Sequence, residues 1–108
     1  MKLRVLPAAR LDIFDIESRL ESEHVGFGID FVRLVDIAIE SLWNQPRFYP
    51  RTEDGPKRLQ TREYYIARFE YRVIYALGRN EIVVLGLVHA RRKPGSWTGR
   101  LKTFKEQS

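Results

Sequence analysis

The stretch that decides the fold is Phe69–Trp97, FEYRVIYALGRNEIVVLGLVHARRKPGSW. In its first part, Phe69–Tyr75, aromatic and β-branched residues alternate with a period of two, as on a half-buried β-strand. Turn residues follow in Gly78-Arg79-Asn80, and the next segment, Ile82–Val88, is apolar on both faces, which predicts a buried central strand. Because this hairpin runs into His89-Ala90-Arg91-Arg92-Lys93, the sequence predicts a concentrated positive site at the margin of a sheet.

Length and composition indicate one soluble domain. The chain has 108 residues, of which 44% are hydrophobic and 31% charged, so we expect a single domain over residues 1–108 with its own core. The absence of Cys excludes a disulfide and a thiolate metal site, and fits a reducing cytosol. The apolar run at the N-terminus is too short for a signal peptide, and no segment approaches the roughly 18 apolar residues of a membrane span. We therefore expect a cytoplasmic protein without membrane contact.

Charge is divided unevenly along the chain. The net charge is +5, with an isoelectric point near 9.8. Residues 1–45 hold five Lys or Arg and eight Asp or Glu, whereas residues 46–108 hold fourteen and six, which gives −3 and +8. A basic surface that serves only solubility would account for the sum. The segregation favours an electrostatic site for a phosphate backbone or an acidic protein segment.

The first half of the chain predicts a strand and two helices. A short strand, Lys2–Leu6, is stopped by Pro7. The period then becomes helical, with Asp12, Asp15 and Arg19 facing away from an apolar stripe of Ala9, Ile13, Ile16 and Leu20. Gly26 and Gly28 mark a corner between helices. The second helix carries the stripe Phe31, Leu34, Val35, Ala38, Ile39 and Leu42, and ends before Pro46.

The second half predicts a sheet. Residues 46–58 contain three Pro and one Gly, as a loop does, and Arg62–Ala67 has strand character. Beyond the hairpin, Ser96 is placed to cap a short C-terminal helix that extends through Lys105. The expected fold is therefore α+β: an N-terminal strand, an antiparallel helical hairpin, then a three-stranded antiparallel sheet with a basic C-terminal segment.

Arg72 and His89 are the residues of the hairpin best suited to chemistry. A guanidinium inside an apolar strand needs a partner, either Glu70 or a helix carboxylate, or it is a cation aimed at a phosphate. His89 at its strand end is either structural or an acid–base group, whereas His24 is expected on the surface. The register decides whether Arg72 and His89 cooperate. Pairing Leu77 with Glu81 separates the two faces, and pairing Gly78 with Glu81 brings Glu70, Arg72 and His89 together.

The C-terminal segment carries a basic patch of Arg91, Arg92, Lys93 and Arg100 around Trp97. Such a group can hold phosphates and stack a base. The alternative is a solvated segment whose Trp97 packs back onto the core, which we favour. Trp43, at the end of the second helix, is assigned to the core.

Several of these features recur in a known order. The first helix opens with Ala9-x-x-Asp12-Ile13, and the second carries Phe31, Ala38-Ile39 and Leu42 before Pro46. The hairpin contains Phe69-x-Tyr71-Arg72-Val73-Ile74-Tyr75, and the ending is His89-Ala90-Arg91-Arg92-x-Pro94-x-x-Trp97. Over nearly its whole length the chain thereby resembles the RelE/ParE superfamily of bacterial toxins from type II toxin–antitoxin pairs.

The resemblance implies a helical hairpin packed on an antiparallel sheet, an antitoxin partner that wraps the toxin, and no cofactor or metal. RelE-like members cut mRNA on the ribosome, which requires a base, an acid and a cation. The positions that match the family's cations are Arg72 and Arg91 or Arg92, and His89 is available as the base or the acid. Some RelE-like members carry a Tyr in the C-terminal segment, where this chain has Trp97, whose indole cannot transfer a proton as a phenol can.

ParE-like members poison DNA gyrase without known hydrolytic chemistry. The ending His-Ala-Arg-Arg-x-Pro-x-x-Trp looks more like this side of the family, so whether the chain is an enzyme depends on the branch. We expect a growth-inhibiting toxin of the plasmid-stabilisation type, with target or partner contact at Arg91, Arg92, Lys93, Trp97 and Arg100. Operator DNA is expected only through the antitoxin. A degenerate member kept as an antitoxin-bound or DNA-bound partner is the third possibility.

Overall fold

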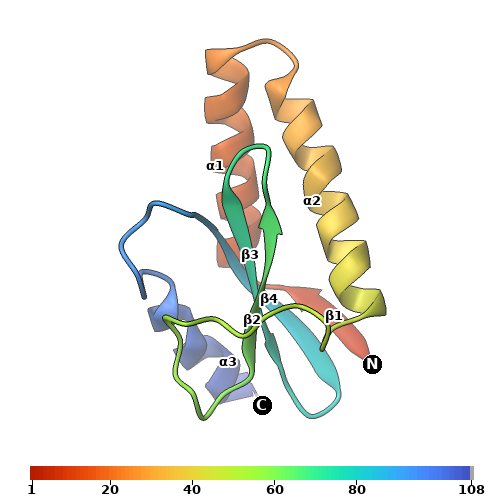
Figure 1. Ribbon diagram of the computed structural model, residues 1–108, viewed down its shortest axis with the longest axis vertical. Coiled ribbons are helices and arrows are strands. Elements are labelled where there is room, and N and C mark those ends of the chain that lie inside the picture. Colours follow the sequence, from red (N-terminus) through yellow and green to blue (C-terminus); the bar gives the residue numbers. More distant parts are fainter. Residues whose placement is uncertain (108) are drawn as a thin grey trace.

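The computed structural model describes residues 1–107 as one α+β unit (Figure 1). Its elements follow the expected order of strand, helix, helix and three strands, with a short helix at the end. They are β1 (Lys2–Val5), α1 (Pro7–Glu23), α2 (Phe27–Asn44), β2 (Thr61–Ile66), β3 (Tyr71–Leu77), β4 (Glu81–His89), a 3₁₀-helix (Thr98–Arg100) and α3 (Leu101–Gln107). Within the described residues, no helix has the length and apolar character needed to cross a bilayer.

The four strands form one sheet in the order β1-β4-β3-β2. The three C-terminal strands are antiparallel, as predicted, and β1 adds to them as a parallel neighbour of β4. A parallel neighbour is possible because the two helices lie between β1 and the rest of the sheet in sequence. The central position of β4 explains its uninterrupted apolar run: Ile82, Val83, Val84 and Leu85 are all 0% exposed.

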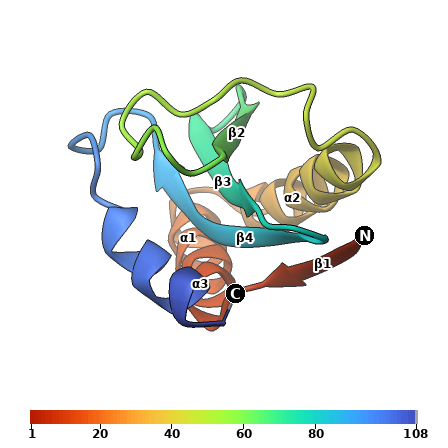
Figure 2. The same cartoon turned by 90° about the horizontal axis from the view of Figure 1, so that it is seen from below.

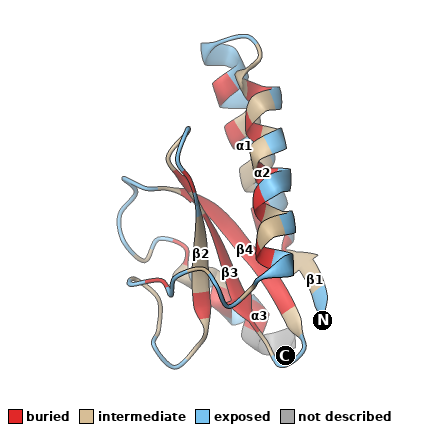
Figure 3. Ribbon diagram, turned by 45° about the vertical axis from the view of Figure 1, so that its right-hand side comes forward, coloured by how far each residue is buried: buried red, intermediate tan, exposed pale blue. Residues whose placement is uncertain are grey.

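The helical hairpin lies along one side of the sheet (Figures 2 and 3). Both predicted stripes supply the contact. Ala9, Ile16 and Leu20 of α1 are buried, as are Phe31, Val35, Ala38 and Leu42 of α2. Phe31 packs edge-on against Tyr71 of β3, with ring centroids 5.5 Å apart. Tyr71 therefore marks the helix-covered face of the sheet, and Arg72, its neighbour, belongs to the opposite face.

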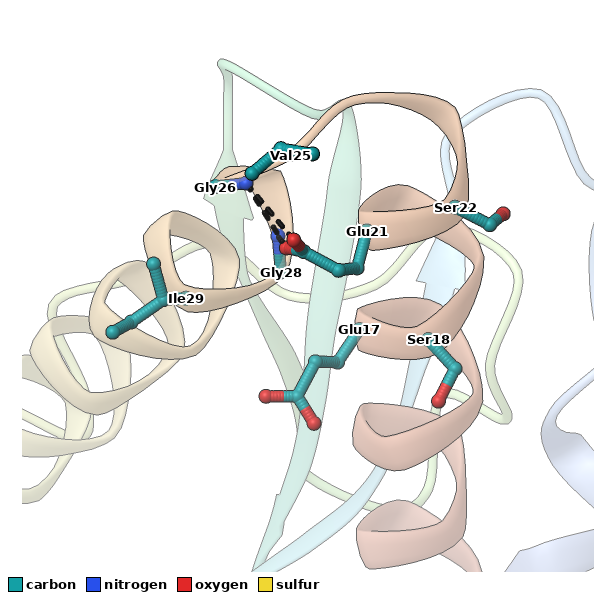
Figure 4. Close-up of a pocket in the computed structure, with 8 residues that line it drawn as sticks. All are labelled: Glu17, Ser18, Glu21, Ser22, Val25, Gly26, Gly28 and Ile29. Carbon is teal, nitrogen blue, oxygen red and sulfur yellow. Dashed lines mark hydrogen bonds between the residues drawn. The ribbon is translucent and has the colours of Figure 1, made fainter.

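The corner between the helices is closed by a carboxylate. Gly26 adopts φ 94°, a left-handed conformation that favours glycine. The Glu21 carboxylate reaches across the corner and accepts hydrogen bonds from the backbone N–H groups of Gly26 and Gly28 at 3.0–3.1 Å (Figure 4). Since the first N–H groups of a helix have no intrahelical acceptor, Glu21 satisfies the start of α2. The tip of the hairpin projects beyond the end of the sheet (Figure 1).

The ion pair between Asp12 and Arg100 bonds to the edge of β4 at the point where β1 ends. The last residue of β4 paired with β1 is Val84. Just beyond it, the Arg100 guanidinium donates to the Leu85 carbonyl at 3.0 Å, and the Leu87 N–H donates to the Asp12 carboxylate at 2.9 Å. Arg100 and Asp12 bind each other at 2.5 and 3.0 Å. The pair thus occupies backbone groups that an exposed strand edge would leave open.

Three sequence expectations fail in ways that have a physical cause. Asp12 was expected to face away from the core, but Arg100 and the edge of β4 draw its carboxylate inward. Trp43 was assigned to the core, yet it is 52% exposed because Leu42 occupies the inward position at the end of α2. Ser96 does not cap the last helix. The chain instead enters it through the 3₁₀ turn that begins at Thr98.

Gly86 is the position where the Arg100–Asp12 pair meets the sheet. A Cβ atom there would lie 2.1 Å from an Arg100 nitrogen and 2.9 Å from an Asp12 oxygen. We predict that Gly86→Ala lowers the free energy of unfolding by about 1–3 kcal/mol, the usual cost of overpacking. Gly99→Ala is the control, because its Cβ would meet no atom within 4 Å. Urea unfolding measures both, and equal stabilities for the two variants would contradict this account of the edge.

Candidate functional site

Arg72 projects from the face of the sheet opposite the helical hairpin and is held by two carboxylates. Its guanidinium donates to Asp54 at 2.7 and 3.1 Å and to Glu63 at 3.0 and 3.1 Å. The Arg72 side chain is only 13% exposed. A partner for Arg72 was expected, but Glu70 and the helices do not supply it. Asp54 lies in the loop before β2, and Glu63 lies on β2 itself.

Asp54 joins three segments that are distant in sequence. Besides the two bonds from Arg72, its carboxylate accepts the Gly95 N–H and the Trp97 Nε1–H, both at 2.9 Å. The hydrogen bonds from Arg72, followed in size by those from Gly95 and Trp97, hold the pKa of Asp54 well below its usual range. The hydrogen bonds that Arg72 donates to Asp54, followed in size by those to Glu63, raise the pKa of Arg72. Asp54 is therefore ionised and fully hydrogen-bonded, and Arg72 is neutralised from within the chain.

The register of the hairpin places Arg72 and His89 on different faces. Leu77 pairs with Ile82, as in the second of the two expected registers, but Tyr71 pairs with His89 and Arg72 with Val88. The shift arises at a β-bulge between Ile74 and Tyr75, where Leu85 is the extra residue on β4. Neither register holds along the whole hairpin, and the single site of Glu70, Arg72 and His89 does not form. His89 packs edge-on against Tyr71 on the helix-covered face, with centroids 5.1 Å apart.

The basic C-terminal patch is divided by the fold. Arg91, Arg92 and Lys93 are exposed together on the turn that follows β4. Trp97 is 1% exposed, which confirms the packed alternative, so its ring offers no surface on which a base could stack. Arg100 is occupied by Asp12, whose hydrogen bond raises the pKa of Arg100. Of the five expected contact residues, three thus remain available as an exposed cationic turn, residues 91–93.

A cleft of about 520 Å³ lies beside the Arg72 network. Asp54, Glu63 and Arg72 line it together with Arg51 and Arg92. Arg51 and Arg92 are exposed in this cleft. The charges of its other cation, Arg72, and of Asp54 and Glu63 are already paired with one another. Within the described part of the chain, no three His, Asp or Glu side chains come together as a metal site would need.

Exposed apolar side chains of the helical hairpin were missed by the sequence analysis. Five large ones are half or more exposed, namely Leu11 and Phe14 of α1 and Ile29, Ile37 and Trp43 of α2. Exposed apolar side chains mark an interaction surface where they form a contiguous patch. A signal was present in the sequence, since Leu11 and Phe14 lie outside the predicted stripe of α1.

The comparisons with known proteins bear on the fold. No protein-family model matches the chain, and no curated protein matches it by sequence. Among solved structures, it is similar to a chain of the chromosomal ParDE toxin–antitoxin system from P. aeruginosa. The TM-score is 0.61 at 14% sequence identity, over 84% of this chain and 97% of the other. The two chains share a fold. This likeness confirms the α+β architecture that was predicted from the sequence.

Removing the Asp54 charge should loosen the loop, β3 and the C-terminal segment together. We predict that Asp54→Asn lowers the free energy of unfolding by about 3 kcal/mol, as expected when one partner of a buried ion pair is lost. Asp36→Asn is the matched control, because Asp36 is an exposed helix carboxylate, and its change should stay within about 0.5 kcal/mol. Urea unfolding at neutral pH measures both variants. Similar small losses would contradict the proposed role of Asp54.

The stability difference between the wild-type chain and Asp54→Asn should also depend on pH. The pKa of Asp54 is lowered in the folded state, from an unfolded value of about 3.9. Its contribution to stability is therefore complete above about pH 5, and is lost as the pH falls below the unfolded pKa and through the folded pKa. The stability difference between wild type and Asp54→Asn should narrow between about pH 5 and pH 2. A constant difference over that range would show that Asp54 is not the titrating group.

Proposed function

We propose that this chain is the toxin component of a type II toxin–antitoxin system, that it arrests bacterial growth by inhibiting DNA gyrase, and that a cognate antitoxin neutralises it. The fold shared with a chain of a ParDE system supports the toxin assignment. The observation that carries the choice of target is the pairing of Arg72 with Asp54 and Glu63. It leaves the cationic turn, residues 91–93, as a cluster of three exposed cations, suited to binding rather than cleavage.

The alternative function is ribosome-dependent cleavage of mRNA. That reaction needs a cation free to stabilise the charge that develops on the phosphate, and an acid–base group close to it. Arg72 already binds two carboxylates, and His89 lies on the other face of the sheet. A cleavage site centred on Arg72 would first have to break bonds that the fold itself uses. The geometry therefore favours a toxin that acts by binding.

Two surfaces support a role for an antitoxin. The cationic turn, residues 91–93, suits an acidic segment. The exposed apolar side chains of the helical hairpin, Phe14 and Trp43 among them, suit the apolar face of a partner element. An antitoxin that wraps the chain would cover both. Contact with operator DNA would then be made through the antitoxin, in the cytoplasm and without a membrane.

The gyrase proposal is tested by DNA supercoiling with purified gyrase. The wild-type chain should inhibit supercoiling. The triple variant Arg91→Gln, Arg92→Gln, Lys93→Gln should require a concentration roughly tenfold higher, because complementary charge accelerates association. The control removes the same three charges elsewhere through Lys57→Gln, Arg79→Gln and Lys102→Gln, all at exposed positions. This control should inhibit nearly as well as wild type.

Two outcomes would overturn the gyrase proposal. One is full supercoiling at high molar excess of the wild-type chain. The other is mRNA cut in the ribosomal A site during translation in the presence of the wild-type chain, with Arg72→Ala losing activity about 10²-fold, as on removal of a preorganised charge. The second outcome would assign the ribonuclease function instead.

A further inference from the structure

A second hollow lies on the helix-covered side of the sheet, away from Arg72. It has a volume of about 420 Å³ between α1 and the end of β4. Arg19 of α1, His89 at the end of β4, and Arg92 of the cationic turn line it. Three nitrogen-bearing side chains from separate segments thus border one cavity. None of the functions considered so far uses Arg19.

The bonding of His89 fixes which ring nitrogen can donate. The backbone N–H of Arg91 donates to His89 Nδ1 at 3.1 Å. Nδ1 must therefore be unprotonated, so the proton of the neutral imidazole is on Nε2. The edge-on contact with Tyr71 holds the plane of the ring. His89 is thereby prepared as a hydrogen-bond donor through Nε2.

Arg19 is also held in place before any ligand arrives. Its guanidinium donates to the hydroxyl of Tyr71. Tyr71 is 4% exposed and packs against Phe31 of α2, so the acceptor is rigid. The Arg19 side chain is 53% exposed, and its ion pair with Glu23 is long, at 3.7 Å. Other nitrogens of Arg19 remain accessible from solvent at a fixed place.

The carboxylates of the hollow do not cancel these donors. Asp12 is already bound by Arg100 and by the Leu87 N–H. Asp15 is exposed and has no ion-pair partner within the described residues. With Asp12 compensated by Arg100, the lining offers two guanidinium groups and one imidazole donor against Asp15. Glu23 lies outside the lining and makes only the long, exposed ion pair with Arg19. That combination suits a small, doubly charged anion better than a cation.

We propose that this hollow binds a phosphate group through Arg19, Arg92 and His89 Nε2, whether the phosphate belongs to a nucleic-acid backbone or to a small phosphorylated ligand. The site differs from the Arg72 cleft because it lies on the opposite face and its cations are not engaged by buried carboxylates. Arg92 lines both hollows. The inference does not depend on gyrase being the target.

The direct test is titration of the full chain with inorganic phosphate at constant ionic strength, followed by NMR. The Arg19 Nε–H and His89 ring signals should shift and saturate. Arg92→Gln, which removes an exposed side chain, should weaken binding roughly tenfold, as for loss of a charge-assisted hydrogen bond. Arg79→Gln is the matched control at the other end of the β3–β4 hairpin, and its affinity should stay within about twofold.

A second variant is expected to change the phosphate affinity in the opposite direction. Asp15→Asn removes the unpaired carboxylate of the lining and should tighten phosphate binding, whereas Asp36→Asn, at an exposed position on α2, should not. If neither ring nor guanidinium signals respond to phosphate, or if Arg92→Gln and Arg79→Gln weaken binding equally, the proposal is overturned.

The source of the phosphate is decided by a second titration, with a short fluorescent DNA duplex. Binding of the duplex that weakens in Arg92→Gln but not in Arg79→Gln, and that inorganic phosphate competes away, assigns the site to a nucleic-acid backbone. Duplex binding that is absent, or equal in the two variants, together with site-specific binding of inorganic phosphate, assigns it to a small phosphorylated ligand. Gyrase inhibition measured on the same variants reports separately on the proposed function.

Discussion

One carboxylate, that of Asp54, determines how the surface opposite the helices is built. It binds a guanidinium from β3, a backbone N–H of Gly95 and the indole N–H of Trp97. Charge-assisted bonds of this kind are stronger than neutral ones, and here they join the loop of Asp54 to β3 and to the segment after β4. The loop before β2 and the segment after β4 are both fixed to the sheet through it. The consequence for function is that Arg72 is part of this framework.

Elements with a clear period could be predicted from the sequence. The stripes of α1 and α2 and the apolar run of β4 follow from burial on one face of a helix or on both faces of a strand. The predictions that failed concern residues whose positions depend on other parts of the chain. Asp12 has the spacing of a solvent-facing residue, and only Arg100, far along the chain, brings it to the edge of β4. The bulge between Ile74 and Tyr75 was also not predicted, although Gly86, an isolated glycine inside the apolar strand, is the kind of residue that marks a bulge.

The sequence predicted which basic residues lie near the candidate site better than it predicted how they are arranged. Arg91, Arg92 and Lys93 are exposed together because they form a turn directly after a strand, which is a local property. Local sequence does not determine whether a given Arg is free. Arg72 and Arg100 are both paired with acids that precede them by many residues, while Arg19, assigned only to an outward helix face, borders a cavity. A count of basic residues therefore overstates the positive surface available to a ligand.

The molecule has two chemically distinct sides as a result. One is a closed network in which Arg72 serves stability. The other carries the Arg19 and His89 side chains around the second hollow. The central claim, a toxin that acts by binding gyrase rather than by cutting RNA, is tested most directly by brief expression in a bacterium with pulse labelling of DNA and protein. The account predicts that DNA synthesis stops before protein synthesis. Protein synthesis stopping first, with replication still under way, would contradict it.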